Sequence, residues 1–185
     1  MEIVTSGYNR NCKSSQGGLD KIWLFPYVKY SRSQIVTDDN FLVSFPQTTI
    51  YSFYSNGTPI FSEDNQTEDG GKYYNQSINL ELNDVENIDR LLKKDYRVII
   101  KDNNGYFRIL GLYIGLECEK IDYNSGSNKQ SFNGYSLSFT GKEEKPSFFI
   151  ENLEDAGFVD NDIVFRITEA GEFRLTENDE FRILG

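Results

Sequence analysis

The chain has no histidine, only two cysteines and only two alanines among its 185 residues. Histidine is the commonest general base and the commonest metal ligand, so Ser-His-Asp and Cys-His catalytic sites are excluded. Cys12 and Cys118 are too few for a zinc site of Cys and His ligands within one chain. The scarcity of alanine, beside plentiful Phe, Tyr, Ile and Thr, favours strands over helices.

Positive charge is also scarce: 19 Lys and Arg face 29 Asp and Glu, which gives a net charge of −10. Binding of duplex DNA needs clustered Lys and Arg, so DNA is not predicted as a tightly bound ligand. No apolar run approaches the roughly 20 residues of a membrane span, and no signal-peptide pattern is seen. We therefore expect a cytoplasmic origin and no membrane partner. Aromatic residues make up 15% of the chain, which predicts a folded domain.

Alternating and short apolar runs predict strands over residues 21–30, 41–45, 48–54, 73–82, 96–101, 106–119, 135–140 and 148–150. In the first run, Trp23 and Phe25 fall on one face of the strand, and Ile22 and Leu24 fall on the other. Residues 62–72 are polar and acidic and contain a Gly-Gly pair, so they are predicted to form a surface loop.

One helix is predicted, over about residues 83–95. Asn83 can cap it, and Glu86 follows three residues later, as in a capping box. Apolar residues at helical spacing then form a stripe. Together with the strands, this pattern predicts a mainly β domain over residues 21–150, a β-sandwich or barrel with one packed helix.

The two ends of the chain differ from this domain. Residues 1–20 are predicted to be an N-terminal arm, and residues 151–161 a linker. In residues 162–185 the triplet Phe-Arg-Ile or Phe-Arg-Leu occurs three times with a spacing of eight, starting at Phe165, Phe173 and Phe181. We predict a small β-meander with Phe, Ile and Leu on one face and Arg on the other, opposite glutamates. About 24 residues cannot hold a core alone, so the meander should dock on the main domain or on another subunit.

No catalytic, cofactor-binding or metal-binding site is predicted. The carboxylates have no motif that marks a glycosidase pair, and the Asp- and Asn-rich turns lack the oxygen ligand that an EF-hand needs at its fifth position. Trp23 with Tyr27 and Tyr30 is a possible sugar-stacking platform; a core or subunit interface is the favoured interpretation of these rings.

Residues 11–24, with the sequence NCKSSQGGLDKIWL, resemble the start of tail-tube-like or head-to-tail ring virion proteins of phages that infect Bacteroidetes, crAss-like phages included. In these proteins a Cys and a Gly-Gly pair precede a strand that runs into an aromatic segment. The helix at 84–94, the strands at 97–101, 107–119 and 134–141, and the acidic Pro-containing stretch at 142–146 are similar too. The resemblance covers residues 8–150, and the Phe-Arg-Ile repeats lie outside it.

The resemblance implies a fold of the phage tail-tube type and a structural, non-enzymatic virion protein of the tail or neck, assembled in the host bacterial cytoplasm. It implies a homo-oligomeric ring, possibly six- or twelve-fold, in which sheets of neighbouring subunits join into an inner barrel. Other tail, ring or portal proteins would be partners. DNA would pass through the channel without sequence-specific binding, and an acidic lumen would repel its phosphates.

Two sets of residues are candidates for contacts in such a ring. The candidates for inter-ring or channel contacts are Glu63, Asp64, Asn65, Glu68 and Asp69. The candidates for a docking arm are Phe165, Arg166, Phe173, Arg174, Phe181 and Arg182. The alternative functions are a carbohydrate-binding β-sandwich module and a small acidic hydrolase that uses paired carboxylates.

Overall fold

The computed structural model describes residues 17–53, 55, 59–68, 71–82, 94–127, 131–161, 164–167 and 173–176. In this part of the chain the protein is mainly β: one large mixed sheet of 12 strands, which does not close, and a separate sheet of two strands. No α-helix occurs in the described residues, and a single 3₁₀ turn spans Arg32–Gln34.

The strands are β1 Leu19–Pro26, β2 Val36–Asp38, β3 Phe41–Ser44, β4 Thr48–Phe53, β5 Ile60–Glu68, β6 Gly71–Leu82, β7 Asp95–Asp102, β8 Phe107–Leu110, β9 Leu116–Asn124, β10 Gly134–Glu143, β11 Phe148–Ile150, β12 Phe158–Asp160, β13 Val164–Ile167 and β14 Phe173–Thr176.

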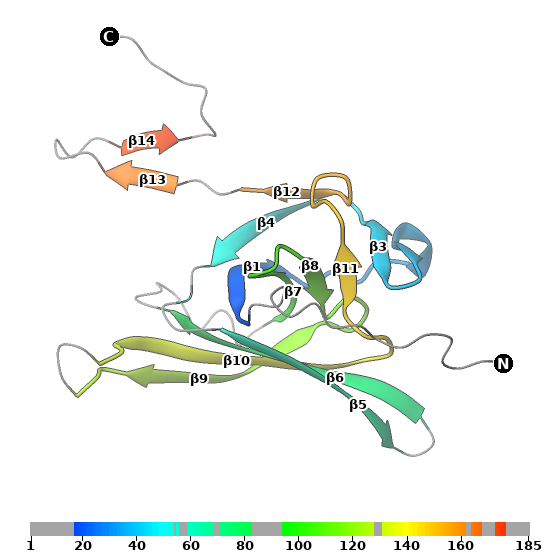
Figure 1. Ribbon diagram of the computed structural model, residues 1–185, viewed down its shortest axis with the longest axis horizontal. Coiled ribbons are helices and arrows are strands. Elements are labelled where there is room, and N and C mark those ends of the chain that lie inside the picture. The colour runs from blue at the N-terminus through cyan, green and yellow to red at the C-terminus, as the bar shows by residue number, and fades with distance from the viewer. Residues whose placement is uncertain are drawn as a thin grey trace, which may run out of the picture.

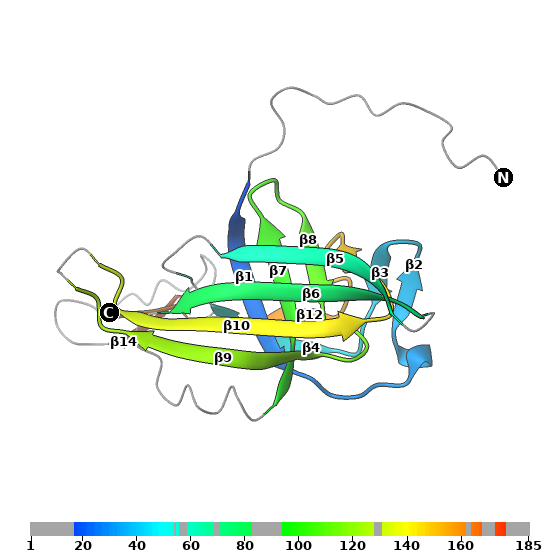
Figure 2. The ribbon, with the colours of Figure 1, turned by 90° about the horizontal axis from the view of Figure 1, so that it is seen from below.

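The large sheet folds into two layers. One layer has four antiparallel strands in the order β5-β6-β10-β9. The other has the order β12-β4-β1-β7-β8-β11-β3-β2. The layers join at one corner, where Asp95 and Tyr96 at the start of β7 pair with Glu117 and Leu116 of β9. The four-stranded layer lies below β1, β7 and β8 in Figure 1, and its strands cross β1 and β7 steeply in Figure 2.

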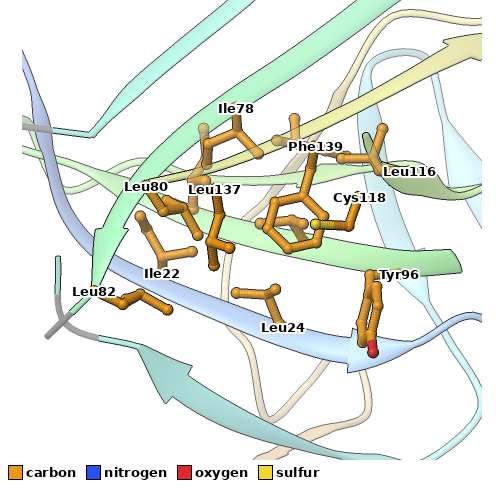
Figure 3. Close-up of a cluster of buried hydrophobic side chains, with 13 residues drawn as sticks. Ile22, Leu24, Ile78, Leu80, Leu82, Tyr96, Leu116, Cys118, Leu137 and Phe139 are labelled. Carbon is orange, nitrogen blue, oxygen red and sulfur yellow. The ribbon is translucent and has the colours of Figure 1, made fainter. Parts of the chain in front are cut away.

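The first hydrophobic core fills the space between the two layers (Figure 3). One residue in two along each strand points into it, as the pleat of a strand requires. Its buried members are Ile22, Leu24, Ile78, Leu80, Leu82, Tyr96, Val98, Ile100, Leu110, Leu116, Cys118, Leu137 and Phe139.

A second core lies on the opposite face of β1, β7 and β8, so these central strands are buried on both faces. This explains why their sequences are continuous apolar runs rather than alternating ones. The buried members are Trp23, Phe25, Ile35, Leu42, Phe45, Ile50, Ile99, Ile109, Leu112, Phe148, Ile150, Ala156 and Phe158. The predicted assignment of Trp23 and Phe25 to one face, and of Ile22 and Leu24 to the other, is confirmed.

Strands are confirmed near six further predicted positions: 41–45, 48–54, 73–82, 96–101, 135–140 and 148–150. Two strand-level predictions are wrong. Residues 62–72 do not form a loop, because β5 and β6 pair in one unbroken register from Ile60 and Asn79 to Glu68 and Gly71. Residues 106–119 are not one strand, because the chain turns at residues 111–115 and the turn separates β8 from β9. Gly111 and Gly115 adopt positive φ there, at 65° and 96°, which favours glycine.

The predicted helix lies mostly outside the described residues, which omit 83–93. Its C-terminal limit is wrong, because Asp95 is the first residue of β7. Residues 151–161, predicted as a linker, contribute β12, which pairs in parallel with β4. Ala156 and Phe158 of this segment are buried in the second core.

The first two strands of the predicted meander are present, as β13 and β14. Their register places Phe165 opposite Leu175 and Ile167 opposite Phe173, so the apolar positions share one face as predicted. Arg166, however, stands opposite Arg174 and not opposite a glutamate. Phe181 and Arg182 of the third repeat lie outside the described residues, as does most of the predicted arm, residues 1–16.

Candidate functional site

The outer face of the four-stranded layer is the most extended polar surface that the fold builds. On β6, Ser77 and Asn79 alternate with buried residues, and on β10 Ser138 and Thr140 do the same. The register sets Ser138 opposite Asn79 and Thr140 opposite Ser77. On the next strand, the Ser62 hydroxyl lies 2.7 Å from that of Ser77. The middle of this face is therefore covered by small hydroxyl and amide side chains.

Carboxylates flank these small side chains. Glu117, Glu119 and Asp122 are exposed on β9, and Asp64 is exposed on β5. Lys120 lies among them and forms an ion pair with Asp122. The polar surface is thus bordered on both sides by negative charge.

Both outer edges of this layer are open in the part of the chain that the structure describes. β5 pairs with β6 alone. β9 pairs with β10 along its length but with β7 only at Leu116 and Glu117. Open edges present unpaired backbone N–H and C=O groups that can pair with another chain. Because four antiparallel strands lie side by side, β5 and β9 run in opposite directions.

The residues predicted for inter-ring or channel contacts lie on the β5–β6 hairpin. Asp64 and Asn65 are exposed on β5, and the Asp64 carboxylate accepts a hydrogen bond of 2.7 Å from the Gln66 amide. Glu68 ends β5, and nothing is described of its side chain; Asp69 lies outside the described residues.

Glu63 has a different position from Asp64 and Asn65. One of its carboxylate oxygens accepts hydrogen bonds from the Gln76 side chain, at 2.9 Å, and from the backbone N–H of Ser147, at 2.7 Å. The Gln76 side chain is buried and in turn accepts from the N–H of Gly111. Glu63 therefore joins β5 to the turn at residues 111–115 and to the segment before β11, a structural role that the sequence did not reveal.

The docking-arm residues are brought together only in part. Phe165 and Arg166 lie on β13, and Phe173 and Arg174 lie on β14, in the separate two-stranded sheet.

The predicted sugar-stacking platform is not formed. Trp23 is 2% exposed and packs in the second core, with its ring 5.9 Å from that of Phe107. Tyr30 packs edge-on against Phe45, and the Tyr27 hydroxyl donates to the Tyr113 carbonyl at 2.5 Å. The favoured interpretation of Trp23, as a core residue, is confirmed.

A buried polar cluster at the corner between the layers was not found from the sequence. Glu143, at the end of β10, is 2% exposed, and its carboxylate accepts hydrogen bonds from the N–H groups of Tyr113, Ile114 and Gly115 at 2.8–3.2 Å. Burial raises the pKa of Glu143 above its ordinary value, although these hydrogen bonds and the charge of Arg97 act in the opposite direction.

Arg97 lies on the other side of the same corner and is 1% exposed. Its Nε donates to the Leu112 carbonyl at 3.0 Å, and its guanidinium lies 4.3 Å from the centre of the Tyr27 ring. Burial lowers the pKa of Arg97, while Tyr27, Tyr30 and Glu143 act to raise it. Arg97 and Glu143 bind mainly the backbone of residues 112–115, so we interpret the cluster as a structural fastening of the turn and not as an active site.

A groove of about 850 Å³ lies beside β12. Phe45, Phe107, Leu153 and Phe158 supply its apolar lining. Glu151, Glu154 and Asp160 contribute carboxylates, and Asp160 forms an ion pair of 3.1 Å with Lys21.

Within the described ranges, no three His, Cys, Asp or Glu residues form a group that could hold a metal ion. No helix in those ranges is long and apolar enough to cross a membrane. Comparison of the chain with family models, with curated proteins and with solved structures finds no match.

Proposed function

We propose that this protein is a structural subunit of a homo-oligomeric ring in a phage tail or head-to-tail joint. In this proposal the outer face of the four-stranded layer is turned toward a channel through which the genome passes. The observation that carries the proposal is a four-stranded layer that combines a polar, acid-bordered outer face with two open edges.

The edges support assembly into a ring. When the β9 edge of one copy meets the β5 edge of the next, the two strands are antiparallel, because β5 and β9 run in opposite directions within the layer. Such a contact joins two different patches of the surface, and its repetition generates a ring if the rotation between copies closes. Every open edge of the layer is then covered.

The outer face supports passage of DNA rather than binding. The hydroxyl and amide side chains of β6 and β10 carry no charge, and the exposed carboxylates of β9 repel phosphate. Adhesion to the phosphate backbone needs rows of Lys or Arg, and Lys120 on β9 is paired with Asp122. A ring of six or twelve copies, contacts with other tail or portal proteins, and a place in the tail or neck remain part of the proposal.

The proposal is tested by proline substitutions in β5. Neighbouring residues of a strand direct their N–H groups to opposite sides, so one of Asp64 and Asn65 donates toward β6 and the other toward the open edge. Proline removes the N–H group. We expect the wild-type protein to form a ring whose mass is a multiple of 21.4 kDa by mass photometry. One of Asp64→Pro and Asn65→Pro should fold but stay monomeric, and the other should disturb the hairpin itself.

Each proline variant is the matched control of the other, and circular dichroism reports which one keeps the fold. A wild-type protein that is strictly monomeric, both after purification and inside disassembled particles, contradicts the ring. Normal assembly of both proline variants contradicts the proposed use of the β5 edge.

A further inference from the structure

We propose that the groove beside β12 receives the C-terminal hairpin β13–β14 of a second copy of this chain. The inference needs self-association of the chain, but it does not depend on a virion role or on the β5–β9 contact.

The groove has the features of a docking surface for a strand or hairpin. β12 pairs with β4 on one side and has no second strand partner within the described residues. An open edge of this kind can accept a strand from another chain, while a neighbouring pocket holds its side chains. The apolar lining of the groove includes Phe107 and Phe158, and Val159 of β12 is 45% exposed.

The hairpin needs a partner surface for two reasons. It has two strands of four residues each and is not joined to the 12-stranded sheet. A two-stranded hairpin is at best marginally stable alone in water. Its register also sets Arg166 directly opposite Arg174, and like charges at opposed positions destabilise a strand pair. An acidic surface beside the hairpin removes this repulsion.

The groove and the hairpin match in chemistry. The apolar positions of the hairpin, Phe165 and Ile167 on β13 with Phe173 and Leu175 on β14, share one face. The rim of the groove carries Glu151 and Glu154, which form no ion pair within the residues that the structure describes. Acidic residues of the C-terminal segment lie between the strands, at 169, 172 and 177–180, and not within them.

A second copy is the occupant because the two surfaces are not joined within one chain. Only residues 161–163 separate β12 from β13, yet β13 pairs with β14 and not with the open edge of β12. When each copy donates one hairpin and accepts another, the open edge and the hairpin are both paired, as in the exchange of elements between protomers.

Photo-crosslinking of the full chain tests the inference. The protein carries p-benzoylphenylalanine in place of Phe173, and ¹⁵N-labelled and unlabelled copies are mixed, crosslinked and analysed by mass spectrometry. We expect crosslinks from position 173 to residues 151–160, in pairs that combine a labelled and an unlabelled peptide. Pairs of a single isotope alone would place the hairpin in its own groove, and crosslinks only to other segments would place it elsewhere. Either result overturns the inference.

Charge reversal across the contact makes the test specific. Glu154→Lys in the accepting copy should lower the mixed crosslink about tenfold, and Arg174→Glu in the donating copy should restore most of it. Glu144→Lys is the matched control, because Glu144 is also exposed but does not line the groove. An equal loss with Glu144→Lys, or no rescue by Arg174→Glu, counts against the contact, and circular dichroism verifies that each variant folds.

Mass photometry of the same samples separates this inference from the proposed ring. Rings that form without a mixed crosslink overturn the docking of the hairpin and leave the ring in place. A mixed crosslink in small assemblies that never close supports the docking and contradicts the ring.

Discussion

Replacement of Glu143 by alanine tests how the two layers of the sheet are fastened together. The carboxylate of Glu143 accepts hydrogen bonds from the N–H groups of three consecutive residues, 113–115, in the turn between β8 and β9. Glu143→Ala leaves these donors without their acceptor. It also removes the negative charge that favours the buried guanidinium of Arg97.

The size of the effect follows from these two losses. A buried N–H that loses its acceptor costs about 1–3 kcal/mol. Removal of one member of a buried charge pair costs about 3–5 kcal/mol. The two losses overlap, because both arise from the same carboxylate, so we expect the free energy of unfolding to fall by about 3–5 kcal/mol. Glu143→Gln keeps one acceptor oxygen near Ile114 and Gly115, and we expect a fall of about 1–2 kcal/mol.

Urea denaturation measures both changes. Trp23 is the only tryptophan and is buried in the second core, so its fluorescence reports unfolding without a label. If Glu143→Ala lowers the free energy of unfolding by less than about 1 kcal/mol, the turn is held by other contacts and the reasoning is refuted. A larger loss for Glu143→Gln than for Glu143→Ala also refutes it.

The same pair of proteins gives a pH dependence. Burial raises the pKa of Glu143 in the folded protein above its ordinary value of 4.5, so the folded state holds this proton more tightly than the unfolded state. The stabilisation from the protonated carboxyl is complete below pH 4.5 and is lost as the pH rises through the raised pKa. The stability of the wild-type protein relative to Glu143→Gln should therefore decrease as the pH rises through this window. A difference that increases with pH would contradict the assigned direction of the shift.

Three further predictions concern other parts of the structure. Phe158 is fully buried and stacks on Phe45 at 5.1 Å, so Phe158→Ala should lower the free energy of unfolding by about 3–5 kcal/mol, while Val159→Ala should change it by about 0.5 kcal/mol or less. Urea denaturation checks both, and a loss below about 1 kcal/mol for Phe158→Ala would mean that residues 151–160 contribute little to the folded domain. A Cβ at Gly141 would lie 2.5 Å from the Gly115 carbonyl oxygen, so Gly141→Ala should lower the thermal midpoint, whereas Gly17→Ala, with open space around it, should not. The Cys118 thiol is buried and its pKa is raised by burial, so in a Cys12→Ser variant a thiol reagent should react in urea but not with the native protein. Rapid labelling without urea would contradict that burial.

Period-two alternation predicted those strands that have one buried and one wet face. Ile78, Leu80 and Leu82 alternate with polar residues on β6, and Leu137 and Phe139 do the same on β10. The pattern is strong there because one face meets the first core and the other is wet. The central strands β1 and β7 were also found, because an apolar run that is buried on both faces still reads as a strand.

The hairpin at residues 62–72 could not be found in this way. Most side chains of β5 are exposed, so no apolar alternation marks this strand, and its composition resembles that of a loop. Its pairing is set by β6, whose inner half is anchored in the core by Ile78 and Leu80. A polar strand that depends on a neighbour for its register carries no signal of its own.

The break at residues 111–115 was missed for a related reason. The sequence remains apolar through the turn, because Leu112 packs in the second core and Leu116 in the first. Only the two glycines mark the turn locally, and the acceptor that satisfies its N–H groups, Glu143, is 28 residues beyond Gly115 in the sequence. Glu143 itself stands next to Glu144 in a charged stretch that reads as solvent-exposed. Pairings of this range require the tertiary structure.

The positions of the carboxylates change what the net charge of −10 means for the proposed channel. Glu63 and Glu143 are engaged with buried amide and backbone groups, so neither is available to repel a passing phosphate. The electrostatic part of the proposal therefore depends on the exposed carboxylates of β9. β9 is also the edge strand that would meet the next copy, so negative charge would recur once per subunit at each junction. Repulsion along the channel would then be periodic around the ring, and it would be a property of the assembly that no single subunit has.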